Sequence, residues 1–269
     1  VRVEGALRSL VNKPRMSARR RIGLGMGVGT FTAGSRKLLE ALPVLADFDY
    51  FWVRDPVSKT NLEQLNVGPS AIVGSDLAFL SDAWCPTELM LKPRTKLPAR
   101  PRVGVILRDW PAGSGASFAE GFRSVIVALS RVYDLTLISF DPATDAGTLR
   151  AFNDLPQLLW QPGSKTLPSF SKMLSNIDVL LTSRAHGAIC GACLGRPSVI
   201  LEIEPKLAAV HAMLPQATRL AAPHSDPATI ALLIDETLSI SIDNIAQDVM
   251  QNRTLSRKAM DTIFEGLDL

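Results

Sequence analysis

Cysteine and histidine are scarce in this chain, with three of each among 269 residues. Three cysteines are too few for a disulfide framework, so the composition favours a reducing compartment. Cys190 and Cys193 have C-x-x-C spacing, but a structural zinc needs four ligands, and only Cys85 and scattered histidines remain. We therefore expect no metal site, and we expect both residues to be small side chains on a packed helix.

Long apolar runs are also missing. The longest stretch without a charged residue, residues 22–35, is rich in glycine and too short to cross a bilayer. We therefore expect no transmembrane helix, and no secretory signal peptide is visible. The chain begins at Val1 rather than at methionine, which favours a fragment of a longer protein.

Positive and negative side chains nearly balance, and the net charge is only +3. Much of it lies in the segment Lys13–Arg21. This segment is either a solvated helix end or loop, or a patch that attracts anionic lipid head groups or a polyanionic substrate. We expect no nucleic-acid partner. We expect a cytoplasmic protein, and the second alternative would bring it into peripheral contact with the inner face of the membrane through this segment.

Short apolar runs alternate with helix-length segments along most of the chain. We expect strands over residues 22–26, 50–53, 71–73, 102–107, 134–140, 157–160, 178–182 and 198–203. We expect helices over residues 35–46, 57–66, 116–131, 143–154, 167–175, 187–195 and 206–213, with two more after residue 227. Such alternation, with helices as crossovers, is typical of parallel, doubly wound sheets.

A proline-rich segment interrupts this alternation between residues 85 and 101. The two stretches on either side predict two Rossmann-like α/β domains that face each other across a cleft. We expect an N-terminal domain over residues 1–90, a linker over 91–101, a C-terminal domain over 102–240 and a helical segment over 241–269.

The sequence "DVLLTSRAHGA" places Arg184 and His186 just past the end of a predicted strand. Ligands of open parallel sheets bind beyond the carboxyl ends of the strands. A guanidinium grips carboxylates or phosphates with two hydrogen bonds, and an imidazole exchanges protons near neutral pH. We expect Gly187 to let the backbone of the following helix approach an anion. The alternative is a histidine bonded to local carbonyls beside a surface ion pair.

Two further segments reach the same edge of the predicted sheet. Arg108 ends another strand and precedes a loop rich in glycine and serine, which is either a phosphate cradle or an ordinary connection. Glu204 and Lys206 follow the strand at 198–203, and Glu202 shares a face with Glu204. We expect Glu204 to accept hydrogen bonds from sugar hydroxyls and Lys206 to hold an anion or begin a helix. Glu202 is expected in solvent.

The glycine-rich stretch "GLGMGVG" is similar to a dinucleotide-binding fingerprint but does not match it. Thr30 takes the position of the last glycine, and little strand precedes the motif. This mismatch weakens the prediction of a nicotinamide-dependent oxidoreductase, and close backbone packing is the simpler explanation.

Five segments in order resemble the polysaccharide pyruvyl transferase family over about residues 22–210. They read "GLGMGVGTF", "DYFWVRDPVSKTNLEQLNV", "VGSDLAFL", "VGVILRDW" and "LLTSRAHGAICGACLGRPSVILEIEPK". The resemblance implies a fold like that of GT-B glycosyltransferases. It also implies transfer of pyruvate from phosphoenolpyruvate to a pair of sugar hydroxyls, which gives a ketal and releases phosphate. The acceptor would be a polysaccharide or its lipid-linked precursor, and no cofactor is implied.

The resemblance also implies roles for individual residues. The family's Arg-x-His element, associated with phosphoenolpyruvate binding and catalysis, falls on Arg184 and His186, and a family arginine falls on Arg108. The family commonly has leucine where this chain has Ala185. Members carry additional strands before the glycine-rich one, so the N-terminal domain, with the acceptor half of the cleft, is expected to be incomplete.

Two other functions stay open at this point. One is a GT-B-type glycosyltransferase or epimerase that uses nucleotide sugars. The other is an inactive module that binds anionic glycans or lipid surfaces through Lys13–Arg21.

Overall fold

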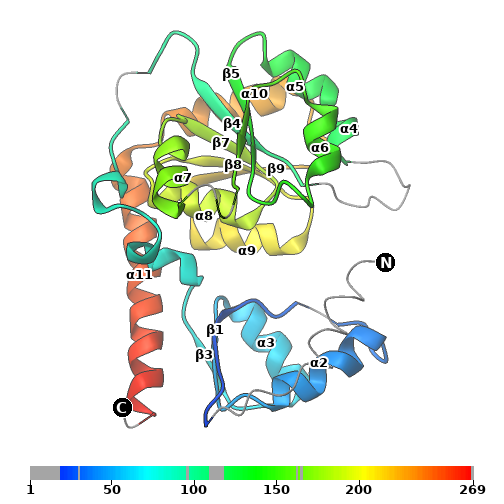
Figure 1. The fold of residues 1–269 in the computed structure, drawn as a ribbon, viewed down its shortest axis with the longest axis vertical. Coiled ribbons are helices and arrows are strands. Elements are labelled where there is room, and N and C mark those ends of the chain that lie inside the picture. Colours follow the sequence, from blue (N-terminus) through cyan, green and yellow to red (C-terminus); the bar gives the residue numbers. More distant parts are fainter. Residues whose placement is uncertain are drawn as a thin grey trace.

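The computed structural model describes residues 19–29, 31–94, 97–108, 118–161, 163 and 166–267. These residues form two α/β units of different size, joined by a connecting segment and by one long helix (Figure 1). The smaller unit is built on a parallel sheet in the order β1-β2-β3. Its strands are β1 (Ile22–Met26), β2 (Tyr50–Val53) and β3 (Ala71–Val73), with the predicted bounds.

Helices α2 (Arg36–Ala46) and α3 (Pro56–Leu65) form the two crossovers of the smaller sheet. The hydroxyl of Ser35 accepts a hydrogen bond from the amide of Leu38 and so begins α2. Asp55 caps α3 in the same way, and the proline that follows it has no N–H to leave unsatisfied.

The larger unit contains a parallel sheet in the order β6-β5-β4-β7-β8-β9. Its strands are β4 (Arg102–Ile106), β5 (Asp134–Ser139), β6 (Gln157–Leu159), β7 (Val179–Thr182), β8 (Ser198–Leu201) and β9 (Thr218–Ala221). The sequence did not predict β9, because "TRLA" is short and contains an arginine. The chain leaves β4 toward one edge and returns through β7 toward the other, so β4 and β7 form the switch point of the topology.

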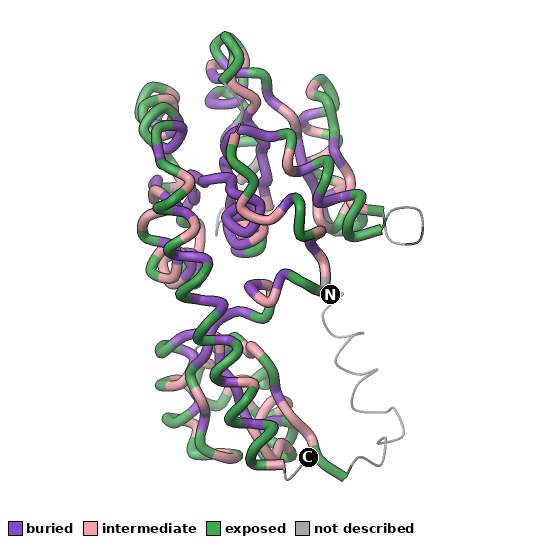
Figure 2. Tube along the Cα trace, turned by 90° about the vertical axis from the view of Figure 1, so that its left-hand side faces the viewer, coloured by how far each residue is buried: buried purple, intermediate pink, exposed green. Residues whose placement is uncertain are grey.

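Helices cover both faces of this sheet. One face packs against α5 (Arg123–Leu129) and α10 (Pro227–Leu238). The other packs against α7 (Leu167–Leu174), α8 (Ala185–Cys193) and α9 (Pro205–Met213). Two shorter helices, α4 (Phe118–Gly121) and α6 (Ala146–Ala151), complete the unit. Buried positions concentrate on its strands (Figure 2), as expected for a sheet covered on both sides.

Three 3₁₀ turns begin the connection between the units: η1 (Leu77–Phe79), η2 (Ser81–Ala83) and η3 (Thr87–Leu89). The long helix α11 (Ile242–Glu265) then runs from the larger unit back along the smaller one (Figure 1). Its residues Ala259 and Ile263 pack against Trp52 of β2. The C-terminal helix α11 therefore packs against both units.

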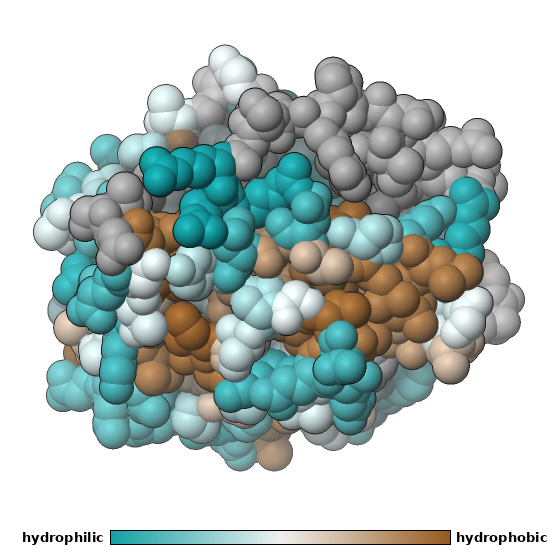
Figure 3. All heavy atoms as spheres, turned by 90° about the horizontal axis from the view of Figure 1, so that it is seen from below, coloured by the Kyte–Doolittle hydropathy of each residue, from teal (hydrophilic) through white to brown (hydrophobic). Residues whose placement is uncertain are grey.

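Within the described ranges, no helix is both long and apolar enough to cross a membrane. Seen from below, the smaller unit exposes apolar side chains among hydrophilic ones (Figure 3), and Leu39 and Val44 of α2 are among the exposed apolar residues. Most of the segment Lys13–Arg21 lies outside the described residues. At its end, Arg20 pairs with Asp49 at 3.1 Å and Arg21 pairs with Asp47.

The two central strands are locked together at their amino ends by Asp178, which precedes β7. Its carboxylate accepts hydrogen bonds from the amide of Arg102 (2.8 Å) and from the guanidinium of the same residue (2.7 and 3.0 Å). Burial alone would raise the pKa of Asp178, but these hydrogen bonds outweigh burial and hold the pKa below its ordinary value of 3.8. These hydrogen bonds fix the amino ends of the two strands, and Arg108 and Arg184 follow the carboxyl ends of the same strands.

We expect Asp178→Asn to lower the free energy of unfolding by about 1–3 kcal/mol at pH 7, because a charged hydrogen-bonding group is lost. The folded-state pKa of Asp178 lies below its unfolded value, so its stabilisation is complete above pH 3.8 and disappears as the pH falls through the folded value. Urea unfolding of the native protein and of Asp178→Asn, at pH 7 and at about pH 3, measures the difference in their free energies of unfolding. An equal difference at both pH values would contradict the prediction.

Candidate active site

The carboxyl ends of β4 and β7 lie side by side, with Ile106 opposite Thr182. Arg108 follows the first strand and Arg184 follows the second. The amide of Arg108 donates a 2.7 Å hydrogen bond to the hydroxyl of Ser183, which ties the two loops together. The arginines therefore stand at the switch point of the sheet, where open α/β folds bind ligands.

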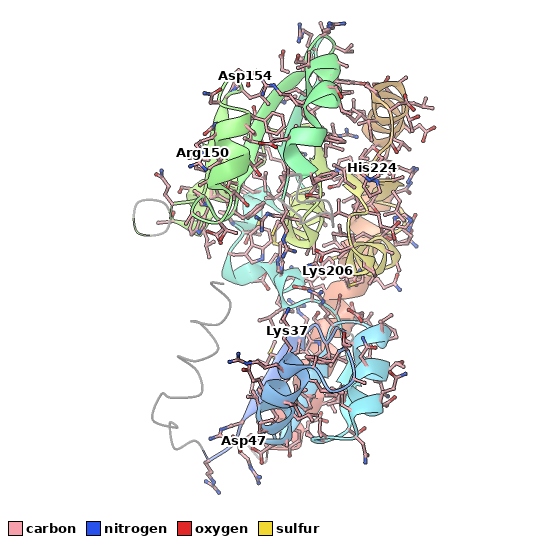
Figure 4. All side chains as sticks on the ribbon, turned by 90° about the vertical axis from the view of Figure 1, so that its right-hand side faces the viewer. Lys37, Asp47, Arg150, Asp154, Lys206 and His224 are labelled. Carbon is pink, nitrogen blue, oxygen red and sulfur yellow. The ribbon has the colours of Figure 1, made fainter. Side chains whose placement is uncertain are left out.

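A pocket of about 150 Å³ opens at this point, on the border between the two units. Lys206 lies at the edge of the larger unit that faces the smaller one, and Lys37 lies across from it (Figure 4). Five of the six predicted site residues line the pocket, the exception being Gly187. The lining residues are Arg54, Arg108, Phe140, Arg184, Ala185, His186, Glu204 and Lys206.

Arg184 is held by a buried carboxylate behind the pocket. It is the N-cap residue of α8 in an extended conformation, and its guanidinium forms an ion pair with Asp145. Asp145 also accepts a 2.7 Å hydrogen bond from the hydroxyl of Ser139 at the end of β5. Among the described residues, Nε of Arg184 is buried without a hydrogen-bond partner. The ion pair with Asp145 thus fixes the orientation of the Arg184 side chain.

Two cations share the carboxylate of Glu204. Its Oε1 lies 3.0 Å from Nη1 of Arg108 and 2.7 Å from Nζ of Lys206. The side chain of Glu204 is only 10% exposed. The predicted contact of Glu204 with sugar hydroxyls would therefore compete with two ion pairs, and its observed contacts make it the anchor of Arg108 and Lys206.

His186 contacts an acid of the other unit. Its Nε2 lies 3.5 Å from Oδ1 of Asp76, which follows β3 and begins the turn η1. Asp76 also accepts hydrogen bonds from the amide of Ala78 (3.0 Å) and from Nη1 of Arg54 (3.2 Å). Burial alone would raise the pKa of Asp76, but the contacts with His186, Ala78 and Arg54 outweigh burial and keep the pKa below its ordinary value.

Arg54 and Asp76 are site residues that the sequence analysis missed. Arg54 directly follows β2, and Asp76 comes three residues after β3, so both stand at carboxyl ends of strands in the smaller sheet. The rule that found Arg108 and Arg184 applies to them as well. A side chain on Gly27 would collide with the guanidinium of Arg54 at about 2.7 Å, so part of the glycine-rich segment makes room for this arginine.

Comparison with known proteins identifies the family. The profile of the polysaccharide pyruvyl transferase family matches residues 12–205, well over half of the chain. The chain belongs to the polysaccharide pyruvyl transferase family. No curated protein sequence matches it.

Solved structures show the fold that this family member adopts. A UDP-N-acetylglucosamine 2-epimerase is 14% identical, with a TM-score of 0.52, over 93% of this chain and 65% of its own. The UDP-GlcNAc 2-epimerase of Methanocaldococcus jannaschii is 11% identical (TM-score 0.53; 81% and 62% covered). HepE of Anabaena in complex with UDP is 15% identical (TM-score 0.54; 99% and 75% covered).

These similarities establish a GT-B-like architecture of two Rossmann-like units, as predicted. At such low identity they carry no information about substrate. The chain spans less than two thirds of the length of the two epimerases.

The structure shows a packing role for Gly187. Its amide donates a 3.0 Å hydrogen bond to the carbonyl of Arg184, so it is already used within the first turn of α8. A Cβ at this position would lie 2.3 Å from Oγ1 of Thr182 and 2.9 Å from Cδ1 of Ile106. Gly187 lets α8 pack directly onto β7, because no side chain fits between them. The helix begins at Ala185, earlier than predicted, because Arg184 is its N-cap.

The remaining predicted features lie away from the pocket or outside the described residues. Cys190 and Cys193 pack on α8 beside Cys85, and burial raises the pKa of Cys190 to about 12 and of Cys85 to about 11. Among the described residues, no cluster of three or more histidine, cysteine or acidic side chains could hold a metal ion. The glycine- and serine-rich loop after Arg108 lies within residues 109–117, which are not described.

We expect Gly187→Ala to destabilise the protein by about 1–3 kcal/mol, the usual cost of overpacking, and to lower activity by moving Arg184 and His186. Gly121→Ala is the matched control, because a Cβ there meets no atom within 4 Å and alanine favours the helix. Urea unfolding measures both changes. Equal stability of the Gly187 variant and the native protein would contradict the packing role.

Proposed function

We propose that this family member transfers a pyruvyl group from phosphoenolpyruvate to two hydroxyls of one sugar, forming a ketal and releasing phosphate. The observation that supports this is the convergence of three arginines, one lysine and one histidine on a pocket of about 150 Å³. Pockets for ligands of drug size usually measure about 300–1,000 Å³. A space this small suits a compact anion better than a nucleotide sugar.

The donor would bind through its carboxylate and its phosphate. Arg108 and Arg184 offer planar guanidinium groups that bind such anions with paired hydrogen bonds. Arg108 and Lys206 both contact the carboxylate of Glu204, so one acid holds two cationic side chains beside the pocket. The amino end of α8 adds partial positive charge beside them.

His186 is the candidate for proton transfer. In the proposed reaction the imidazolium gives a proton to the methylene carbon of phosphoenolpyruvate, and the adjacent carbon becomes an oxocarbenium-like centre. The first sugar hydroxyl forms a C–O bond there and returns its proton to the imidazole. The C–O bond to phosphate then breaks, the second hydroxyl attacks the same carbon, and its proton leaves with the phosphate. Cationic side chains would stabilise the charge that develops on the leaving group.

Membership of the family indicates a saccharide acceptor but does not identify the sugar or its carrier. We propose a lipid-linked precursor presented at the inner face of the membrane. Contact with that surface through Lys13–Arg21 belongs to the same proposal.

The direct test is phosphate release from phosphoenolpyruvate in the presence of a panel of lipid-linked saccharides, run beside UDP release or epimerisation with UDP-sugars. We expect acceptor-dependent phosphate release and no turnover of UDP-sugars. Turnover of a UDP-sugar alone would favour a glycosyltransferase or epimerase. Salt-sensitive binding to anionic vesicles with no turnover of either donor would favour a binding module.

We expect His186→Ala to lower kcat by about 10²–10⁴-fold, the usual contribution of a positioned acid or base. His224→Ala is the matched control, because His224 is exposed and does not line the pocket. Full turnover by a folded His186→Ala variant would remove this residue from the mechanism.

We expect Arg108→Ala to raise KM for phosphoenolpyruvate about 10-fold or more, since hydrogen bonds to charged groups contribute about 1.5–3 kcal/mol. KM for the acceptor should change much less. Arg100→Ala is the control, because Arg100 precedes the same strand at its opposite end and pairs with Asp134. A larger effect on the acceptor than on the donor would contradict the anion-clamp role.

A further inference from the structure

Asp76 stands where the smaller unit meets the larger one. It follows β3 and begins the turn η1, and its contact with His186 crosses from the sheet of the smaller unit to a helix of the larger. The side chain is only 6% exposed, whereas that of His186 is 59% exposed. The acid is thus fixed inside the fold while the imidazole projects into the pocket.

Two hydrogen bonds fix the carboxylate of Asp76, and a third contact holds its backbone. Oδ1 accepts a hydrogen bond from the amide of Ala78 (3.0 Å), and Oδ2 accepts one from the guanidinium of Arg54 (3.2 Å). The carbonyl of Asp76 lies 3.5 Å from the hydroxyl of Ser256 on α11. A carboxylate bonded through both oxygens and through its own backbone has little freedom to turn away from His186.

The helix α11 also holds the residue before Asp76. The hydroxyl of Ser75 lies 2.6 Å from Oδ1 of Asn252, and Nδ2 of Asn252 donates to the carbonyl of Met213 at the end of α9. The segment that carries Asp76 is therefore anchored to the larger unit. This anchoring keeps the acid facing α8.

A carboxylate beside one ring nitrogen determines which nitrogen carries the proton in the neutral imidazole. A proton on Nε2 would face Oδ1 of Asp76, 3.5 Å away, and would leave Nδ1 to exchange a proton with substrate. A carboxylate in this position also stabilises the imidazolium and holds the ring in one orientation.

We infer that Asp76 is a positioning residue, which orients the ring of His186 and selects its tautomer for proton transfer through Nδ1. The inference rests on the proposed function. It adds that the reaction needs both units in place, because the acid and the imidazole come from different ones.

A purely structural role for Asp76 is the alternative, because it caps η1 and pairs with Arg54. Asp76→Asn separates the two roles, since an asparagine oxygen caps a turn about as well as an aspartate. Arg54 also keeps a neighbouring carboxylate, that of Asp55 at 3.4 Å. The matched control is Asp226→Asn, which changes the capping acid of α10, a residue that does not line the pocket.

The test is a double-mutant cycle of Asp76→Asn and His186→Gln, with phosphate release from phosphoenolpyruvate as the readout. We expect Asp76→Asn to lower kcat about 10–100-fold, as loss of a group that orients a functional histidine does, with KM for phosphoenolpyruvate within about 3-fold of native. In the His186→Gln background the same change should have no further effect. Asp226→Asn should leave kcat unchanged.

Equal losses from Asp76→Asn in both backgrounds would overturn the inference, as would an effect confined to KM. A second readout does not depend on turnover. The chain has three histidines, so ¹⁵N spectra of the imidazoles assign His186 by comparison with His186→Gln. We expect neutral His186 to carry its proton on Nε2 in the native protein, where Oδ1 of Asp76 lies 3.5 Å away.

The two proposals fail in distinguishable ways. Absence of phosphate release by the native protein, with the tautomer as expected, would refute the proposed function and leave the contact between Asp76 and His186 intact. Phosphate release together with a proton on Nδ1 of native His186 would refute the positioning role alone. A variant of Asp76 that does not fold leaves the native tautomer as the deciding measurement.

Discussion

The adjacency of β4 and β7 is the constraint on which the rest of the structure depends. Parallel strands end at the same edge of a sheet, and at a switch point the following loops diverge and leave a crevice. Arg108 and Arg184 enter this crevice from the two central strands. Asp178 locks the same strands at their amino ends, and Ser183 ties the loops at the carboxyl ends. The position of the cationic groups thus follows from strand pairing and not from flexible loops.

Each arginine of the pocket is held by a carboxylate that is itself largely buried. Asp145 holds Arg184, Glu204 holds Arg108, and Asp76 holds Arg54. Burying such pairs is costly, because both partners lose water. The arrangement holds the guanidinium groups in fixed positions, so a ligand that contacted them would require little rearrangement. The helix α11 extends this order across the border, because it contacts both units.

Much of the fold could be predicted from the sequence, since strands buried on both faces are nearly continuous apolar runs and their spacing reveals the crossovers. The short edge strand β9 was missed because "TRLA" lacks that signal. Arg108 and Arg184 were predicted because strand ends are visible in a sequence. Arg54 and Asp76 also follow strand ends, but the sequence does not show how the two sheets face each other, so their place in this site is known only from the structure. The packing role of Gly187 was not predicted, since the neighbour it accommodates, Thr182, is known only from the structure.

A crystal structure of the protein with phosphoenolpyruvate bound tests the central claim most directly. We expect the carboxylate and the phosphate to contact the guanidinium groups of Arg108 and Arg184, with the methylene carbon within reach of the imidazole of His186. Donor density at a different surface, or a pocket whose arginines stay engaged only with Asp145 and Glu204 at saturating donor, would contradict it.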